Sequence, residues 1–172
     1  MLKLLFNKEI YDEVILEGLP KAKKFLWIGT ADIKDMYVAK GSRMAPLLEV
    51  LAELIKRKVD VRLIHAKEPG QAFRDDFDKY PVLFSGLERV LCQRVHFKMV
   101  IIDGTLNYCG SANLTGAGMG AKNERNRNFE NGFLTDEAVI IRQLMEQFDS
   151  VWRGDYCKKC GRKSYCEDCP LD

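Results

Sequence analysis

Hydrophobic and polar residues recur with clear periods along the first half of the chain. Apolar positions three to five residues apart predict a helix that starts at Asn7 and stops near Pro20. The continuous apolar run at residues 25–29 predicts a buried strand, and alternation over residues 59–64 predicts a second strand. Between these strands, Ser42 is suited to cap a second helix whose leucines and isoleucines lie on one side.

The second half of the chain carries closely spaced strand patterns. A polar segment with helical tendency precedes Gly86, and apolar runs after it predict strands at 90–92, 95–102, 106–109 and 129–134. An amphipathic pattern from Asp136 to Trp152 predicts a final helix. The order β-α-β-α, then several strands, then a helix predicts an α/β fold, in which a mixed β-sheet is flanked by helices on both faces.

Length and composition set limits on this picture. A chain of 172 residues fits one domain with a small appendage, and the periodic pattern gives way to cysteines near Gly154, so we expect a domain over residues 1–153 and a tail over 154–172. A net charge of +2 is too small to indicate nucleic-acid binding by itself. No apolar run approaches the roughly 18 residues that cross a bilayer. The N-terminal apolar stretch is also too short for a signal peptide, so we expect a cytoplasmic protein without a transmembrane segment.

The most concentrated polar chemistry lies between residues 96 and 113. His96, Lys98, Ser111 and Asn113 supply an imidazole, an ammonium, a hydroxyl and a carboxamide, which suit the holding and attack of a phosphate. Alternation along a strand places His96 and Lys98 on the same face, about 7 Å apart from the rise per residue.

A turn signal inside this segment predicts how the strands pair. Asp103-Gly104 is typical of a two-residue type I′ hairpin turn. A hairpin with this turn pairs Ile102 with Thr105, and counting outward places Ser111 opposite His96. Opposed residues project to one side of a sheet, so we expect the Ser111 hydroxyl beside the imidazole.

These residues form one long motif. The spacing His-x-Lys-x4-Asp-x6-Gly-Ser-x-Asn is matched at every fixed position by His96, Lys98, Asp103, Gly110, Ser111 and Asn113. The motif resembles the HKD motif of the phospholipase D superfamily. The element order, the segment 128–132 and the last helix are similar to the family as well, so the resemblance covers roughly residues 5–153.

The resemblance implies a phosphodiesterase that forms a covalent phosphohistidine and needs no catalytic metal. His96 would be the nucleophile. Lys98, Ser111 and Asn113 would hold the non-bridging oxygens of the phosphate. Glu130 would orient a histidine ring by accepting a hydrogen bond from its second nitrogen.

The histidine count adds an expectation about assembly. The family reaction uses two histidines, but the only other histidine, His65, lacks the remaining motif positions. Two-fold symmetry would bring two copies of His96 together, and small single-motif members of the family are built this way, so we expect a homodimer with the site at its interface. Such members include nucleases, so the expected activity is that of an endonuclease. The alternatives are phospholipid hydrolysis or phosphatidyl transfer, and a non-catalytic nucleic-acid-binding module.

A basic loop follows the motif directly. Lys122, Arg125 and Arg127 lie between Asn113 and Glu130, where a long loop is positioned to reach the mouth of the site. Lysine and arginine contact phosphates without reading sequence, so these three residues are candidates for nucleic-acid binding. The other interpretation is a solvated loop.

The tail carries the spacing C-x2-C-x5-C-x2-C, formed by Cys157, Cys160, Cys166 and Cys169. Paired C-x2-C elements supply four thiolates for a tetrahedral structural Zn²⁺. The spacing does not match the common iron–sulfur runs. A small redox or metal-handling protein centred on these cysteines is a further class of function that the sequence leaves open.

Structural interpretations compete with the functional ones at several positions. The turn alone explains Asp103, and we favour a structural role for it. Glu130 fits the support of a catalytic histidine and a solvated strand residue equally well. We expect His65 to be structural, and Cys92 and Cys109 to be small buried apolar residues.

Overall fold

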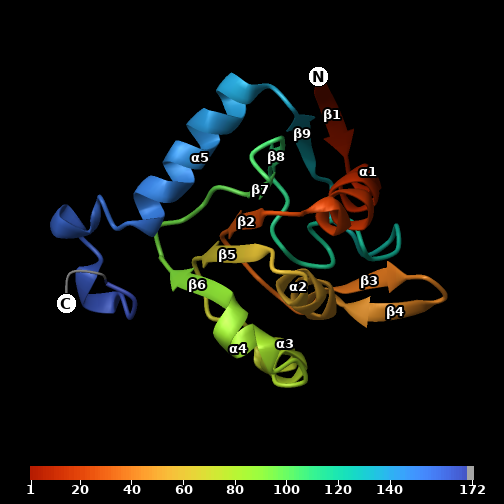
Figure 1. Cartoon of the computed structure of the whole chain (residues 1–172), viewed down its shortest axis with the longest axis horizontal. Helices are drawn as coiled ribbons and strands as arrows, with labels where there is room; N and C mark the ends of the chain where they lie inside the picture. Colours follow the sequence, from red (N-terminus) through yellow and green to blue (C-terminus); the bar gives the residue numbers. More distant parts are fainter. Residues whose placement is uncertain (170–172) are drawn as a thin grey trace.

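Seven strands form one mixed sheet at the centre of the structure, a computed structural model that describes residues 1–169 (Figure 1). The sheet order is β1-β9-β8-β7-β2-β5-β6; the β2–β5 and β5–β6 pairs are parallel, and the other pairs are antiparallel. The strands of this sheet are β1 (Leu2–Phe6), β2 (Phe25–Thr30), β5 (Asp60–His65), β6 (Leu87–Leu91), β7 (Met99–Ile102), β8 (Leu106–Gly110) and β9 (Asn131–Thr135). A separate hairpin is formed by β3 (Tyr37–Lys40) and β4 (Arg43–Pro46).

Helices cover both faces of the sheet, as the sequence predicts (Figure 1). They are α1 (Lys8–Ile10), η1 (Tyr11–Gly18), η2 (Leu19–Lys21), α2 (Leu47–Lys56), α3 (Gln71–Phe77), α4 (Val82–Gly86), α5 (Ala138–Trp152), η3 (Cys157–Lys159) and η4 (Lys163–Tyr165). The first three are consecutive turns that together match the helix predicted from Asn7 to Pro20.

Alternation along the central strands divides the apolar residues between two cores. Leu26 and Ile28 of β2 belong to the larger core, which includes apolar residues of η1 and α2. Trp27, which lies between them in sequence, belongs to the second core and stacks on Phe148 of α5 with ring centroids 5.0 Å apart. The sheet is therefore buried on both sides, which explains the nearly continuous apolar run of β2.

Some local predictions were wrong. The strand β1 was not predicted; it is exposed at Leu2, Leu4 and Phe6 and so lacks the alternation of a half-buried strand. Ser42 lies in the β3–β4 turn, and the second helix begins only at Leu47. The strand expected from residue 95 begins at Met99.

The tail docks against the β6 edge of the sheet, beyond the end of α5 (Figure 1). The Leu91 amide of β6 donates to Asp168 Oδ2 at 2.6 Å, and Gln93 Nε2 donates to the Tyr165 carbonyl at 2.8 Å. The last three residues of the tail expected over 154–172 lie outside the described residues. Within the described range, no helix is long and apolar enough to span a membrane.

Candidate active site

His96 and Lys98 meet at the entry to β7. Lys98 Nζ lies 3.2 Å from His96 Nδ1 and donates to the His96 carbonyl at 2.7 Å. The imidazole is exposed, whereas Lys98 is only 7% exposed. The backbone of Lys98 is fixed by the next strand, because the Gly110 amide donates to the Lys98 carbonyl at 3.1 Å. The core thus holds an ammonium against a ring that solvent can reach.

Burial changes the acidity of this ammonium. Removal from water lowers the pKa of Lys98 below its ordinary value, and the negative charge of Glu130 acts in the opposite direction. A partly desolvated cation interacts more strongly with an anion than a solvated one does. The position therefore suits a phosphate oxygen.

The hairpin turn forms as predicted, but the register differs by one residue. Asp103 and Gly104 both have positive φ values, 54° and 67°, and the Thr105 amide donates to the Ile102 carbonyl at 3.0 Å. The ladder, however, pairs Ile102 with Leu106, so Thr105 is an extra residue outside it.

This shift overturns the expected neighbours of the motif residues. Cys109 pairs with Met99, whereas the two-residue turn assumed from the sequence would have paired it with Lys98. By the same register, Ser111 is not opposite His96. The prediction that the hairpin delivers the Ser111 hydroxyl to His96 was therefore wrong, because it assumed that both turn-flanking residues enter the ladder.

Asp103 acts on the backbone of a neighbouring strand. Its carboxylate accepts hydrogen bonds from the Lys24 amide at 2.7 Å, the Lys23 amide at 2.9 Å and the Phe25 amide at 3.0 Å. Burial alone would raise the pKa of Asp103, but these amides outweigh it and hold the pKa below the ordinary value. Asp103 thereby links the hairpin turn to the start of β2. It follows the end of β7, whereas His96 precedes the start of that strand.

Ser111 and Glu130 contact each other at the start of β9. Ser111 Oγ donates to Glu130 Oε2 and accepts from the Asn131 amide at 3.1 Å. Asn128 Nδ2 donates to Glu130 Oε1 at 3.0 Å, and the Glu130 amide donates to Asn7 Oδ1 at 3.0 Å. The Glu130 carboxylate therefore contacts the Ser111 hydroxyl and the Asn128 carboxamide. Its charge raises the pKa of Lys98 against the effect of burial.

Asn113 is oriented by the end of β2. Its Oδ1 accepts from the Asp32 amide at 3.0 Å and lies 3.4 Å from Thr30 Oγ1. The buried Thr30 hydroxyl also accepts from the Leu114 amide at 2.9 Å and donates to the Asp32 carbonyl at 2.7 Å. Because Oδ1 is occupied, the Nδ2 group of Asn113 is the part left to donate to a ligand.

Thr30 and Asp32 were missed by the sequence analysis. Both follow the buried strand predicted at residues 25–29, and ligand sites in α/β sheets lie at the carboxyl ends of strands. Their position just after a predicted buried strand was the signal that could have identified them as site residues.

In the part of the chain that the structure describes, the side chains of the remaining candidates make no hydrogen bond to this group. Lys122 and Arg125 are exposed and Arg127 is half-exposed. They lie on a loop that folds back on itself, because the Lys122 amide donates a hydrogen bond to the Gly116 carbonyl at 3.0 Å. His65 is buried at the end of β5, with Nδ1 2.8 Å from the Lys67 carbonyl oxygen. Its position fits the structural role expected for it.

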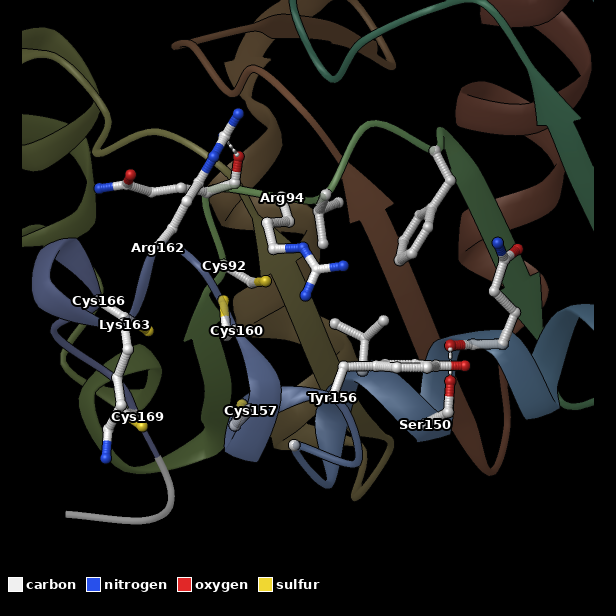
Figure 2. A pocket seen from close by; sticks show the side chains of 16 residues that line it. Cys92, Arg94, Ser150, Tyr156, Cys157, Cys160, Arg162, Lys163, Cys166 and Cys169 are labelled. Atoms are coloured by element: carbon white, nitrogen blue, oxygen red, sulfur yellow. Dashed lines mark hydrogen bonds between the residues drawn. The ribbon is translucent and has the colours of Figure 1, made fainter.

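The four tail cysteines line one cavity of about 270 Å³, and Cys92 joins them from the end of β6 (Figure 2). Burial raises the pKa of Cys157, and the neighbouring thiols raise it further. The Arg162 amide and the Arg94 side chain lower the pKa of Cys160. In the part of the chain that the structure describes, no three His, Cys, Asp or Glu side chains are placed to hold a metal ion. The sulfurs therefore surround one space without converging on a single point.

Comparison with known families identifies the domain. A family described as "Cardiolipin synthase, PLD-like domain" matches residues 15–152. The chain belongs to this phospholipase D-like family. Its match covers most of the chain, including the whole motif from residue 96 to residue 113, and stops before the cysteine-rich tail. No curated protein sequence matches the chain.

Solved structures share the phospholipase D-like fold. Nuc from Salmonella typhimurium, a phospholipase D family member, superposes with a TM-score of 0.64 at 17% identity, over 89% of this chain and 94% of that chain. NucT from Helicobacter pylori gives 0.61 at 17% identity, over 87% and 95%. TrmBL2, an archaeal chromatin protein with a novel mode of DNA binding, gives 0.58 at 15% identity, over 88% of this chain and 52% of that chain.

Proposed function

We propose that this phospholipase D-like protein is a nuclease that cleaves phosphodiester bonds of nucleic acids without a catalytic metal. The observation that carries the proposal is the contact between the exposed His96 imidazole and the buried Lys98 ammonium, 3.2 Å apart. A nucleophile open to substrate and a desolvated cation beside it are the groups that attack on a phosphate requires. The family assignment supports the same chemistry.

The reaction takes place in two displacements. His96 attacks the phosphorus, a nitrogen–phosphorus bond forms, and the bond to the leaving oxygen breaks. The protonated imidazole of His96 of the partner subunit gives its proton to that oxygen. Water then loses a proton to the same partner imidazole and attacks the phosphohistidine, which releases a phosphate monoester and restores His96.

The contact with Lys98 indicates a rearrangement on substrate binding. A protonated Lys98 donates to Nδ1, and a neutral ring then carries its hydrogen on Nε2. In that arrangement the lone pair of Nδ1 is occupied by the ammonium and Nε2 carries a hydrogen, so neither ring nitrogen is free to attack phosphorus. We therefore expect the Lys98 ammonium to leave Nδ1 and move to a phosphate oxygen when substrate binds.

The hydrogen-bond pattern ranks the phosphate ligands. Lys98 and the Nδ2 group of Asn113 have donors to offer. Ser111 gives its hydroxyl hydrogen to Glu130, so it becomes a phosphate donor only if that contact opens. In this proposal Glu130 supports the site through Ser111 and through its charge near Lys98.

The homodimer is part of the proposal, because one chain supplies a single motif histidine. Exposed apolar side chains beside the site support a partner surface. Phe129 is 97% exposed next to Glu130, and Phe6, which pairs with Asn131, is 51% exposed. Large apolar side chains exposed in a group are typical of protein interfaces.

Basic residues in the loop that follows the motif favour nucleic acid over phospholipid as the substrate. Lys122 and Arg125 are exposed and Arg127 is half-exposed, so a polyanion on the surface of this loop can contact them. The fold is also shared with TrmBL2, whose description includes DNA binding. A phospholipid substrate is the alternative that the family description favours.

A structural Zn²⁺ in the tail completes the proposal. The donor chemistry fits, since four thiols line one cavity, and Cys160 already receives hydrogen bonds from Arg162 and Arg94. Coordination would require the sulfurs to draw together, so we expect zinc to tighten the tail. Zinc binding would be measured as metal content of the purified protein.

One assay tests the activity. Purified protein is incubated in EDTA with labelled DNA, labelled RNA and phospholipid vesicles, beside His96→Ala. We expect cleavage of nucleic acid, a loss of at least about 1,000-fold in the variant, and an acid-labile phosphate on His96 in the parent protein. The oligomeric state of the variant, measured by sedimentation, is the control for folding.

The other outcomes separate the alternatives. Hydrolysis of phospholipid alone would indicate a lipid enzyme. Binding of nucleic acid without cleavage of any substrate would indicate a non-catalytic module. Full cleavage by His96→Ala would refute the assigned nucleophile.

A further inference from the structure

The tail places an arginine beside the catalytic histidine. Arg162, which lies between η3 and η4, lines a cavity of about 320 Å³ together with His96 and Arg94. The two arginines come from different parts of the chain, Arg94 from the segment before β7 and Arg162 from the tail. This cavity is therefore a groove between the phospholipase D-like domain and the tail, with the proposed nucleophile on its wall.

A second cavity continues this groove away from His96. It is the cysteine-lined space of about 270 Å³, which shares Gln93, Arg94, Val95 and Arg162 with the first cavity and adds the aromatic side chain of Tyr156 (Figure 2). Zinc is proposed to occupy the cysteine side of this space, so the surface offered to a nucleotide is the side that Arg94, Arg162 and Tyr156 form. Tyr156 is 58% exposed, so its ring is accessible to a ligand. Among the described residues that line the two cavities, there is no aspartate or glutamate. The groove thus combines cations with an aromatic surface.

The arginines are anchored but retain donors for a ligand. Arg162 Nη1 donates to the Gln93 carbonyl at 2.9 Å, which fixes the side chain against the domain (Figure 2). A guanidinium has five N–H donors in a planar fork, so this bond uses one of them. Arg94 lies close enough to Cys160 to lower the pKa of its thiol. Arg162 is therefore held in place by a carbonyl that a phosphate would not need to displace, and Arg94 lines the same cavity.

We propose that the tail forms the second wall of the substrate groove and binds the nucleotide next to the scissile phosphate of a single-stranded nucleic acid. Arg162 and Arg94 hold the phosphate of that nucleotide, and Tyr156 stacks on its base. The proposal rests on the nuclease function proposed above. It names a substrate class and gives the tail a direct role in binding.

The choice of a single strand follows from the aromatic ring. Proteins that bind single strands combine a positive groove with aromatic side chains on which bases stack, because unpaired bases have accessible faces. A duplex presents its phosphates but keeps its bases stacked inside. A duplex would therefore use the arginines and leave Tyr156 without a role.

Kinetics of Arg162→Gln test the phosphate contact. Glutamine keeps an N–H donor for the Gln93 carbonyl but removes the charge. With a single-stranded oligonucleotide we expect KM to rise about tenfold and kcat to change little. The slope of log KM against log salt concentration should decrease by about 0.7, the value for one phosphate contact with a single strand. With bis(p-nitrophenyl) phosphate, which has no neighbouring nucleotide, kcat/KM should be unchanged.

Lys158→Gln is the matched control. It removes one positive charge from the tail at an exposed residue that lines neither cavity. We expect its KM for the oligonucleotide to stay within about twofold of the parent value. An equal rise in KM for both variants would refute a specific contact at Arg162, and so would an equal loss by Arg162→Gln on both substrates.

Tyr156→Ala and Tyr156→Phe test the stacking. Alanine should weaken single-strand binding about tenfold and leave duplex binding unchanged, whereas phenylalanine should preserve both. Equal weakening on duplex and single strand would overturn the assignment of substrate class.

These measurements separate the groove from the proposed activity. If the parent protein cleaves no nucleic acid, the nuclease proposal fails, and direct binding of a fluorescent oligonucleotide to the parent and to Arg162→Gln still tests the groove. If the parent protein cleaves and Arg162→Gln matches it in KM and in salt dependence, the groove fails and the nuclease proposal stands.

Discussion

The motif hairpin and the cysteine tail carry the chain's two sets of chemical groups, and they are held in different ways. In the hairpin, Lys98 is 7% exposed and its backbone is bonded to the neighbouring strand. In the tail, the short turns η3 and η4 contain no buried residue. Hydrogen bonds from Leu91, Gln93 and Arg162 join the tail to the domain. The hydrophobic core therefore positions the first set, whereas the second set needs another source of order.

This difference indicates what each region gains from its surroundings. Burial of Lys98 removes a charge from water, which opposes stability but strengthens its interaction with a phosphate. None of the described residues of the tail is buried. A metal bound by four thiolates supplies folding free energy in small domains of this kind, and the proposed zinc would do so here. The two regions should therefore respond differently to substitution, one as a site held by the core and the other as a site held by a proposed ligand.

The largest effect is expected at Lys98. Lys98→Met should lower kcat for phosphodiester cleavage about 100- to 1,000-fold, because in the proposed reaction it removes the charge that stabilises the transition state. Its melting temperature should stay the same or rise, because the variant no longer buries an ammonium whose pKa is lowered by desolvation. Calorimetry and steady-state kinetics on one preparation check both parts. A large loss of stability in Lys98→Met would show that the ammonium is structural.

Asp103 should show the opposite pattern, with stability affected and chemistry preserved. Asp103→Ala removes the acceptor of three backbone amides and places alanine at a φ of 54°, so we expect a loss of about 3 kcal/mol in the free energy of unfolding. Activity measured well below the melting temperature should be unchanged. Asp103→Asn, which tolerates this φ and keeps one acceptor oxygen, should lose less.

The same residue gives a pH dependence with a defined sign. The folded pKa of Asp103 lies below the unfolded value, so its contribution to stability is present above about pH 4 and is lost as the pH falls through the folded pKa. In urea unfolding experiments, the free energy of unfolding of Asp103→Asn should decline less below pH 4 than that of the parent protein. A decline equal to that of the parent protein would assign the acid sensitivity to other carboxylates.

The motif was predictable where its contacts are local in sequence. His96 and Lys98 are two residues apart, and one extended segment is enough to bring their side chains together. The α/β fold was predictable because buried strands and amphipathic helices alternate with clear periods. The hairpin register was not, because no residue pattern distinguishes Thr105 inside the ladder from Thr105 outside it.

Contacts between distant segments were beyond the sequence argument. Thr30 reaches Leu114 because residues 33 and 114 form an isolated parallel bridge across 81 positions of the chain. The docking of Arg162 beside His96 depends likewise on where α5 ends relative to β6. Spacing within the tail identifies the cysteines but contains nothing about the surface on which the tail lies.

A smaller effect is expected at Thr30, which links β2 to Asn113. Thr30→Val keeps the shape but leaves the Leu114 amide and the Asp32 carbonyl unpaired, so we expect about 1–2 kcal/mol of destabilisation and a loss of up to about tenfold in kcat. Thr135→Val is the matched control, because that buried hydroxyl also donates to a carbonyl and accepts from an amide, at Met1 and Glu137. The control should lose similar stability and keep its kcat. Equal kcat values for the two variants would remove Thr30 from the support of the site.

The smallest effect on the domain is expected from loss of the proposed zinc ion. Cys157→Ser should abolish zinc binding and make the tail sensitive to limited proteolysis, because the tail lacks buried residues to hold it. The unfolding midpoint of the domain and the cleavage of bis(p-nitrophenyl) phosphate should change little, since His96, Lys98 and Asn113 are held by the sheet. Cys109→Ser, a substitution on β8 away from the tail, should keep both the zinc and the protease resistance. If Cys157→Ser also abolished hydrolysis of the small diester, the tail would be needed for the chemistry itself, and the contrast between the two regions would not hold.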